Sequence, residues 1–64
     1  ERCPFEKLNL DQGFVAGLDT SRQSRAIVSA TISMAHALDL QVTAEGIETE
    51  IQAAFLVSRG CDEL

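Results

Sequence analysis

The sequence predicts an α/β fold in which parallel strands are joined by helical crossovers. Residues 7–11 and 41–45 alternate polar and apolar side chains, which is the period of a β-strand. Residues 21–38 have the apolar spacing of an amphipathic helix, and a second helix signal begins at residue 49. The order strand, helix, strand, helix therefore predicts about two βα units, and residues 61–64 are expected to begin a third strand.

Composition and charge limit the function classes that remain. The 64 residues are 45% hydrophobic and 23% charged, which is typical of a globular protein that can bury only a small core. A net charge of -5 argues against binding to a nucleic acid polymer. Neither a membrane span nor a signal peptide is recognisable. Cys3 and Cys61 form no Cys-x-x-Cys pair, so we expect reduced, buried thiols in a cytoplasmic protein.

Each predicted strand has one apolar and one polar face. We expect the apolar faces to pack on helices and the polar faces to point inward. The apolar positions are Leu8, Leu10, Val42 and Ala44, and the polar positions are Asn9, Asp11, Thr43 and Glu45. In barrels of parallel strands the chemistry lies at the C-terminal strand ends, so Glu45 is the best functional candidate on pattern alone.

The connections carry their own signals. Residues 12–18 contain two glycines in a short apolar run, which predicts a loop or a single turn, with Phe14 filling a gap in the core. Thr20 or Ser21 can cap the first helix. The stripe expected to face the core is Ile27, Ala30, Met34 and Leu38. His36 lies opposite that stripe, so we expect it to be exposed or in a second layer and not to bind a metal.

The second helix has clear start and stop signals. Thr49 and Gln52 match a capping box, and Gly60 is well placed to end the helix near Arg59. Apolar residues cover nearly the whole circumference of this helix, which predicts neighbours on more than one side. Gly46, just after the second strand, suits a tight turn.

Four segments of the chain together resemble the later part of an EAL domain, found in cyclic di-GMP-specific phosphodiesterases. They are residues 4–15, 25–28, 34–38 and 44–49. The last of them is similar to the family motif A-E-G-V-E-T, with Ile47 in place of valine. The resemblance implies that residues 1–64 are a partial EAL domain, a fragment of a modified (β/α)8 TIM-like barrel that holds approximately its sixth and seventh strands with their helices.

The same resemblance implies an activity and a metal site. The expected reaction is hydrolysis of one phosphodiester bond of cyclic di-GMP, giving linear pGpG, with two Mg²⁺ or Mn²⁺ ions that activate water and stabilise charge. Glu45 matches the first glutamate of the motif and is expected to be a metal ligand close to the nucleophilic water. Glu48 matches the second and is expected to support the next helix through its dipole. Most other ligands would come from the rest of the EAL domain.

One departure from the family concerns a positive charge. Residues 9–11 read Asn-Leu-Asp where the family has K-I-D, so Asn9 occupies the position of the active-site lysine. Lys7 shares the strand face but lies about 6 to 7 Å further from the C-terminal end. An amide donates a hydrogen bond without charge, and loss of such a donor typically reduces transition-state stabilisation by roughly 2.7 to 4 kcal/mol. We expect Asp11 to fix the loop that follows it.

Two main functions therefore stay open at this point. One is an active phosphodiesterase in bacterial second-messenger signalling, for which Glu45 and Asn9 are the candidate catalytic residues. The other is a catalytically degenerate EAL domain that acts as a cyclic di-GMP receptor or a protein-docking module. A homodimer, a fused sensory or cyclase-type domain, and a membrane tether through another segment are further open expectations. A weaker third alternative is a structural module that folds alone.

Overall fold

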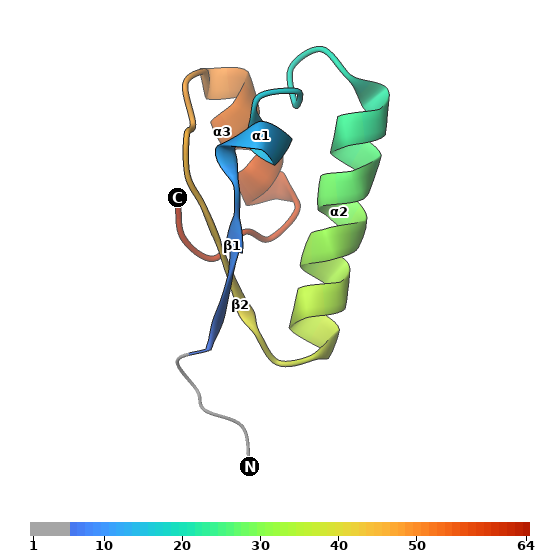
Figure 1. Cartoon of the computed structure of the whole chain (residues 1–64), viewed down its shortest axis with the longest axis vertical. Coiled ribbons are helices and arrows are strands. Elements are labelled where there is room, and N and C mark those ends of the chain that lie inside the picture. The colour runs from blue at the N-terminus through green and yellow to red at the C-terminus, as the bar shows by residue number, and fades with distance from the viewer. Residues whose placement is uncertain (1–5) are drawn as a thin grey trace.

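The computed structural model describes residues 6–64, which form a two-stranded parallel sheet with helices packed beside it (Figure 1). The elements in chain order are β1 (Lys7–Leu10), α1 (Gln12–Val15), α2 (Arg22–Ala37), β2 (Gln41–Ala44) and α3 (Glu50–Ser58). The predicted order is confirmed, and each strand ends one residue before its predicted limit. The expected third strand is reduced to one bridge, in which Glu63 pairs in parallel with Thr43.

The core lies between the apolar face of the sheet and the helices. Its buried members are Leu10, Val15, Leu18, Val28, Ile32, Ala35, Val42, Ala44 and Leu56, with Leu8 packed against them. The two strands, α2 and α3 all contribute to this cluster, so the helices cover the same face of the sheet. The predicted division of the strands into apolar and polar faces is confirmed.

The predicted core stripe of α2 is wrong by one position. Val28, Ile32 and Ala35 are buried, whereas Ile27, Met34 and Leu38 are 44%, 56% and 47% exposed. Two adjacent apolar stripes run along this helix, and the one that meets the sheet contains Val28, Ile32 and Ala35. The sequence spacing alone does not distinguish them.

The short helix α1 confirms the single turn predicted for residues 12–18, but Phe14 does not fill a core gap. Phe14 is 47% exposed, and Val15 and Leu18 occupy the core instead. A helix this short presents one apolar position inward, and Val15 takes that position. The aromatic side chain before it therefore stays about half exposed.

The helix ends follow the sequence signals closely. The Ser21 hydroxyl accepts a hydrogen bond from the Ser24 N–H at 3.1 Å, and Thr49 and Gln52 form the expected capping box. Gly60 ends α3 with a φ of 92°, and Asp39 follows α2 with a φ of 64°. Both residues occupy the left-handed region that closes helices.

The second cysteine is consistent with the expected reduced state. Cys61 is a free, partly buried thiol, and burial is the main cause that raises its pKa. Cys3 lies outside the described residues. None of the helices within residues 6–64 has both the length and the apolar character to cross a membrane.

Candidate functional site

The polar face of the sheet presents Asn9 and Glu45 at the C-terminal ends of neighbouring strands. Parallel pairing places Asn9 beside Thr43, and Glu45 follows β2 directly. The Glu45 N–H donates to the Leu10 carbonyl at 3.3 Å, which extends the strand pairing by one residue. Gly46 then turns the chain with a φ of 77°. Glu45 is therefore held at the sheet edge where such folds place chemistry.

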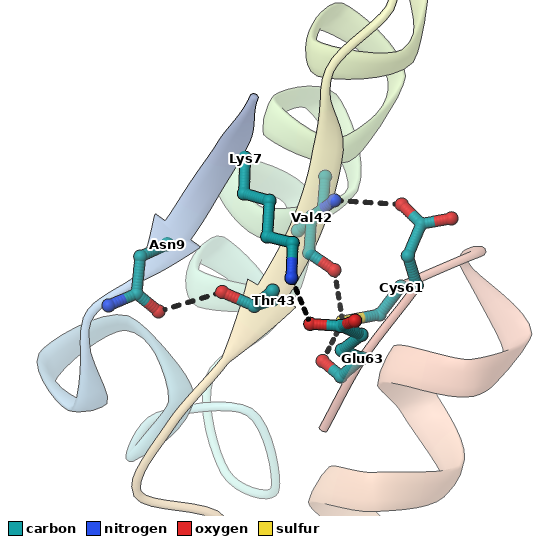
Figure 2. Close-up of polar contacts among 7 residues, drawn as sticks. Lys7, Asn9, Val42, Thr43, Cys61 and Glu63 are labelled. Atoms are coloured by element: carbon teal, nitrogen blue, oxygen red, sulfur yellow. Dashed lines mark hydrogen bonds and ion pairs between the residues drawn. The ribbon is translucent and has the colours of Figure 1, made fainter. Parts of the chain in front are cut away.

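Three polar side chains are joined in one line across this edge. The Asn9 Nδ2 donates to Glu45 Oε2 at 2.8 Å, and the Thr43 hydroxyl donates to Asn9 Oδ1 at 3.0 Å. Figure 2 shows Thr43 and Asn9 facing each other from the two strands. The structure thus brings together the two residues that sequence reasoning proposed for the site, Asn9 and Glu45, and adds Thr43 to them.

Lys7 does not take the place of the missing cation. Its ammonium Nζ lies 3.0 Å from Glu63 Oε1, so the side chain reaches across β2 toward the C-terminal segment (Figure 2). Within residues 6–64 no lysine, arginine or histidine pairs with Glu45. Among the described residues, the side chain that donates a hydrogen bond to this carboxylate is the neutral amide of Asn9.

The turn after Glu45 is fixed from two sides. A Cβ atom on Gly46 would lie 2.3 Å from the Gln12 Cβ, so α1 packs directly on the turn. On the other side, Gln52 is only 3% exposed, and its Oε1 accepts the N–H groups of Glu48 at 2.7 Å and Thr49 at 3.2 Å. These contacts limit the motion of the segment that carries Glu45.

Glu48 lies at a small cavity next to this turn. The cavity has a volume of about 290 Å³, and its lining residues are Gln12, Gly13, Ala16, Gly46 and Glu48. Glu48 precedes the cap residue Thr49 and so lies outside the first turn of α3. Its expected dipole role stays a prediction.

Asp11 acts on the following turn through its backbone. Its carbonyl accepts the Phe14 N–H at 2.9 Å and the Val15 N–H at 3.4 Å, which starts α1, whereas its side chain makes no capping hydrogen bond. A main-chain carbonyl can do this at any residue, so the predicted role of Asp11 in fixing the following loop stays a prediction.

Glu45 has the chemistry of a single metal ligand. Its carboxylate is exposed, and within the described residues its Oε1 has no hydrogen-bond partner, so this hard oxygen is open to a cation such as Mg²⁺ or Mn²⁺. No group of three His, Cys, Asp or Glu side chains suited to a metal occurs among residues 6–64. The described residues therefore offer one carboxylate, that of Glu45, as a ligand for a metal ion.

His36 lies at the other end of the sheet. It is exposed, as predicted, and its Nε2 lies 2.8 Å from Asp62 Oδ2. That carboxylate also accepts the Val42 N–H at 2.7 Å.

Sequence reasoning missed Thr43 and Gln52 as supporting residues. Thr43 was placed on the polar face without a role, although parallel pairing of the two strands would have set it beside Asn9. Gln52 was identified as part of the capping box, but its side-chain oxygen also accepts the Glu48 N–H. This second hydrogen bond depends on the path of the turn, which the sequence does not indicate.

Comparisons with known proteins agree on one family. The family model described as the EAL domain matches residues 1–64. The chain is 41% identical over 64 residues to the bifunctional diguanylate cyclase/cyclic di-GMP phosphodiesterase MucR of Pseudomonas aeruginosa, covering all of this chain and 9% of that protein. The chain thus spans about a tenth of that curated relative.

Solved structures give the same result. The EAL domain of Mycobacterium smegmatis DcpA is similar with a TM-score of 0.83 and 43% identity, over 88% of this chain and 25% of that one. The PaMucR phosphodiesterase in its c-di-GMP complex is similar with a TM-score of 0.82 and 41% identity, over 88% and 23% of the respective chains.

Proposed function

The chain belongs to the EAL domain family, and from that membership we propose that it is part of a phosphodiesterase that hydrolyses cyclic di-GMP to linear pGpG. Its fold is accordingly a piece of a TIM barrel. The observation that carries the proposal is Glu45, an exposed carboxylate fixed at the C-terminal strand edge with one oxygen open. Relatives named as cyclic di-GMP phosphodiesterases support the substrate.

This chain would contribute one metal ligand and a neighbouring side chain that orients it. Glu45 would hold one Mg²⁺ or Mn²⁺ ion through its open oxygen, and Asn9 holds the other carboxylate oxygen in place. When bound, such ions supply activation of water and stabilisation of charge on phosphate oxygens. The rest of the EAL domain would provide the remaining ligands.

The absence of a cation beside Glu45 favours a second candidate function. Asn9 donates a hydrogen bond without charge, and Lys7 is engaged with Glu63, so the described residues bring no positive side chain to developing phosphate charge. A degenerate EAL domain that binds cyclic di-GMP, or docks a partner protein, without cleavage would need no such charge. If the protein is an enzyme, we expect it to hydrolyse cyclic di-GMP slowly. If it is a receptor, we expect no hydrolysis.

A product assay separates these functions. The complete protein that contains this chain is incubated with cyclic di-GMP and Mn²⁺, and linear pGpG is separated by chromatography. We expect slow product formation that Glu45→Ala lowers by at least about 100-fold, as is typical when an essential charge-stabilising group is lost. The control Glu50→Ala removes an exposed carboxylate from the first turn of α3 and should leave the rate of pGpG formation unchanged.

Two results would count against the enzyme. If Glu45→Ala hydrolyses as fast as the natural protein, Glu45 does not serve the reaction. If the natural protein binds cyclic di-GMP but forms no product, the receptor function replaces the enzyme. A homodimer, a fused sensory or cyclase-type domain and a cytoplasmic location stay predictions.

A further inference from the structure

We propose that Thr43 is a positioning residue, whose hydroxyl fixes the Asn9 amide so that the amide nitrogen faces Glu45. The orientation of the Asn9 amide follows from hydrogen bonds in the structure. Only the expected effect on metal binding rests on the proposed function. The Thr43–Asn9 pairing arises because Asn9 occupies the position for which the resemblance to the family implies a lysine.

The direction of each hydrogen bond follows from donor and acceptor chemistry. An ionised carboxylate can only accept, so the Asn9 atom that lies 2.8 Å from Glu45 Oε2 must be the nitrogen. The amide oxygen then faces Thr43, and an oxygen that only accepts requires the hydroxyl, 3.0 Å away, to donate. The line therefore runs from Thr43 through Asn9 to Glu45 in one direction.

Thr43 is well suited to hold this direction. It lies on β2 between β1 and the Glu63 bridge, and it is less exposed than Asn9. A threonine side chain has few rotamers, whereas the last torsion of an asparagine is broad and close to two-fold. Without the Thr43 donor, only the Glu45 contact orients the exposed amide, which is then held less tightly.

A lysine in place of Asn9 would not need this help. An ammonium has three donors and no acceptor, so every orientation presents a donor to Glu45. Thr43 should therefore matter in the natural protein and lose its importance in an Asn9→Lys background. A purely structural role of Thr43 in the sheet would act equally in both backgrounds.

The test uses Mn²⁺ binding to the complete protein, followed by electron paramagnetic resonance of the free ion. Thr43→Val keeps the shape and removes the hydroxyl, and Thr43→Ser retains the hydroxyl as the rescue control. We expect Thr43→Val to weaken Mn²⁺ binding by about 2- to 10-fold, the range typical of one hydrogen bond, and Thr43→Ser to restore it. In the Asn9→Lys background the same change should have no measurable effect.

Several outcomes would overturn the proposal. Equal weakening by Thr43→Val in both backgrounds would show a structural role, and no weakening in the natural background would show that the hydroxyl does not position the site. If Mn²⁺ binds but cyclic di-GMP is not cleaved, the enzyme fails while the Thr43 result remains readable.

If the natural protein binds no Mn²⁺, the metal role of Glu45 fails, and a second measurement decides on Thr43. In protein labelled with ¹⁵N-asparagine, the Asn9 side-chain signal is the one that Asn9→Lys removes. Faster solvent exchange of that amide in Thr43→Val, reversed in Thr43→Ser, supports the positioning. Unchanged exchange overturns it.

Discussion

The two ends of the β1–β2 sheet use a carboxylate in opposite ways. At the N-terminal end, Asp62 Oδ2 accepts the Val42 N–H at 2.7 Å and lies 2.8 Å from the His36 ring nitrogen, which joins α2, β2 and the C-terminal segment. At the C-terminal end, Glu45 accepts one side-chain hydrogen bond, from the neutral amide of Asn9.

The difference lies in how many hydrogen bonds engage each carboxylate, and it matches the proposal that the Glu45 end serves chemistry. The Asp62 oxygen is engaged by two groups, and these hold its pKa below the ordinary value, the His36 hydrogen bond first and the Val42 N–H second. Glu45 keeps one oxygen without a partner among the described residues. Barrels of parallel strands commonly divide their ends in this way.

Removing the support of the Glu45 turn should have the largest effect on stability. Gly46→Ala places a Cβ atom 2.3 Å from the Gln12 Cβ at a residue with a φ of 77°. We expect the free energy of unfolding to fall by about 2 to 4 kcal/mol, from left-handed strain and overpacking together. Urea denaturation of the complete protein measures it.

Gly13→Ala is the matched control for that experiment. The added Cβ would meet no atom closer than 3.7 Å, and alanine suits a helical position, so the stability should not fall and should rise by at most about 1 kcal/mol. Equal losses from the two substitutions would mean that the turn is not a constrained part of the C-terminal end.

Asp62→Asn, at the N-terminal end of the sheet, should lower the free energy of unfolding by less than Gly46→Ala does. The size of this loss should depend on pH. Because the pKa of Asp62 is lowered on folding, its contribution is present above the ordinary value of 3.8 and is lost as the pH falls through the folded pKa. The side chain is 34% exposed, so after allowance for solvent screening we expect a loss of about 1 kcal/mol at pH 7.

Thermal denaturation of the natural and variant proteins from pH 7 downward checks this prediction. The difference in melting temperature should shrink as the pH falls below 4. Asp39→Asn serves as control, because asparagine tolerates the left-handed conformation that Asp39 adopts. A difference that grows toward acid would contradict the account of Asp62.

We expect the smallest effect on stability at the Lys7–Glu63 ion pair, which lies between the two ends of the sheet. Both side chains are well exposed, 41% and 53%, so Lys7→Met should change stability by less than about 0.5 kcal/mol. Cyclic di-GMP hydrolysis should be unchanged, as measured by product chromatography. Loss of turnover on the scale of Glu45→Ala would show that Lys7 serves as the missing cation.

The fold was largely predictable because its signals are local. Alternating side chains set β1 and β2, and the Thr49 capping box and Gly60 set the two ends of α3. The face of α2 was not predictable, since Ile27 and Val28 begin adjacent apolar stripes and only contact with the sheet selects Val28.

The site was predictable only in part. Glu45 and Asn9 follow from strand ends and from the family motif, but the Thr43 contact depends on the register that sets Thr43 beside Asn9. The support from Gln12 depends on how α1 packs on Gly46, a contact across 34 positions that no local pattern encodes.

We propose that Glu45 serves a phosphodiesterase site whose turnover is limited by the neutral Asn9. The most direct test is cyclic di-GMP hydrolysis with Mn²⁺ by the complete natural protein, its Asn9→Lys variant and the Asn9→Lys, Glu45→Ala double variant. We predict slow natural turnover, a gain of about 10² to 10³-fold with lysine, and no turnover in the double variant. An unchanged rate with lysine, or hydrolysis that survives without Glu45, would contradict the claim.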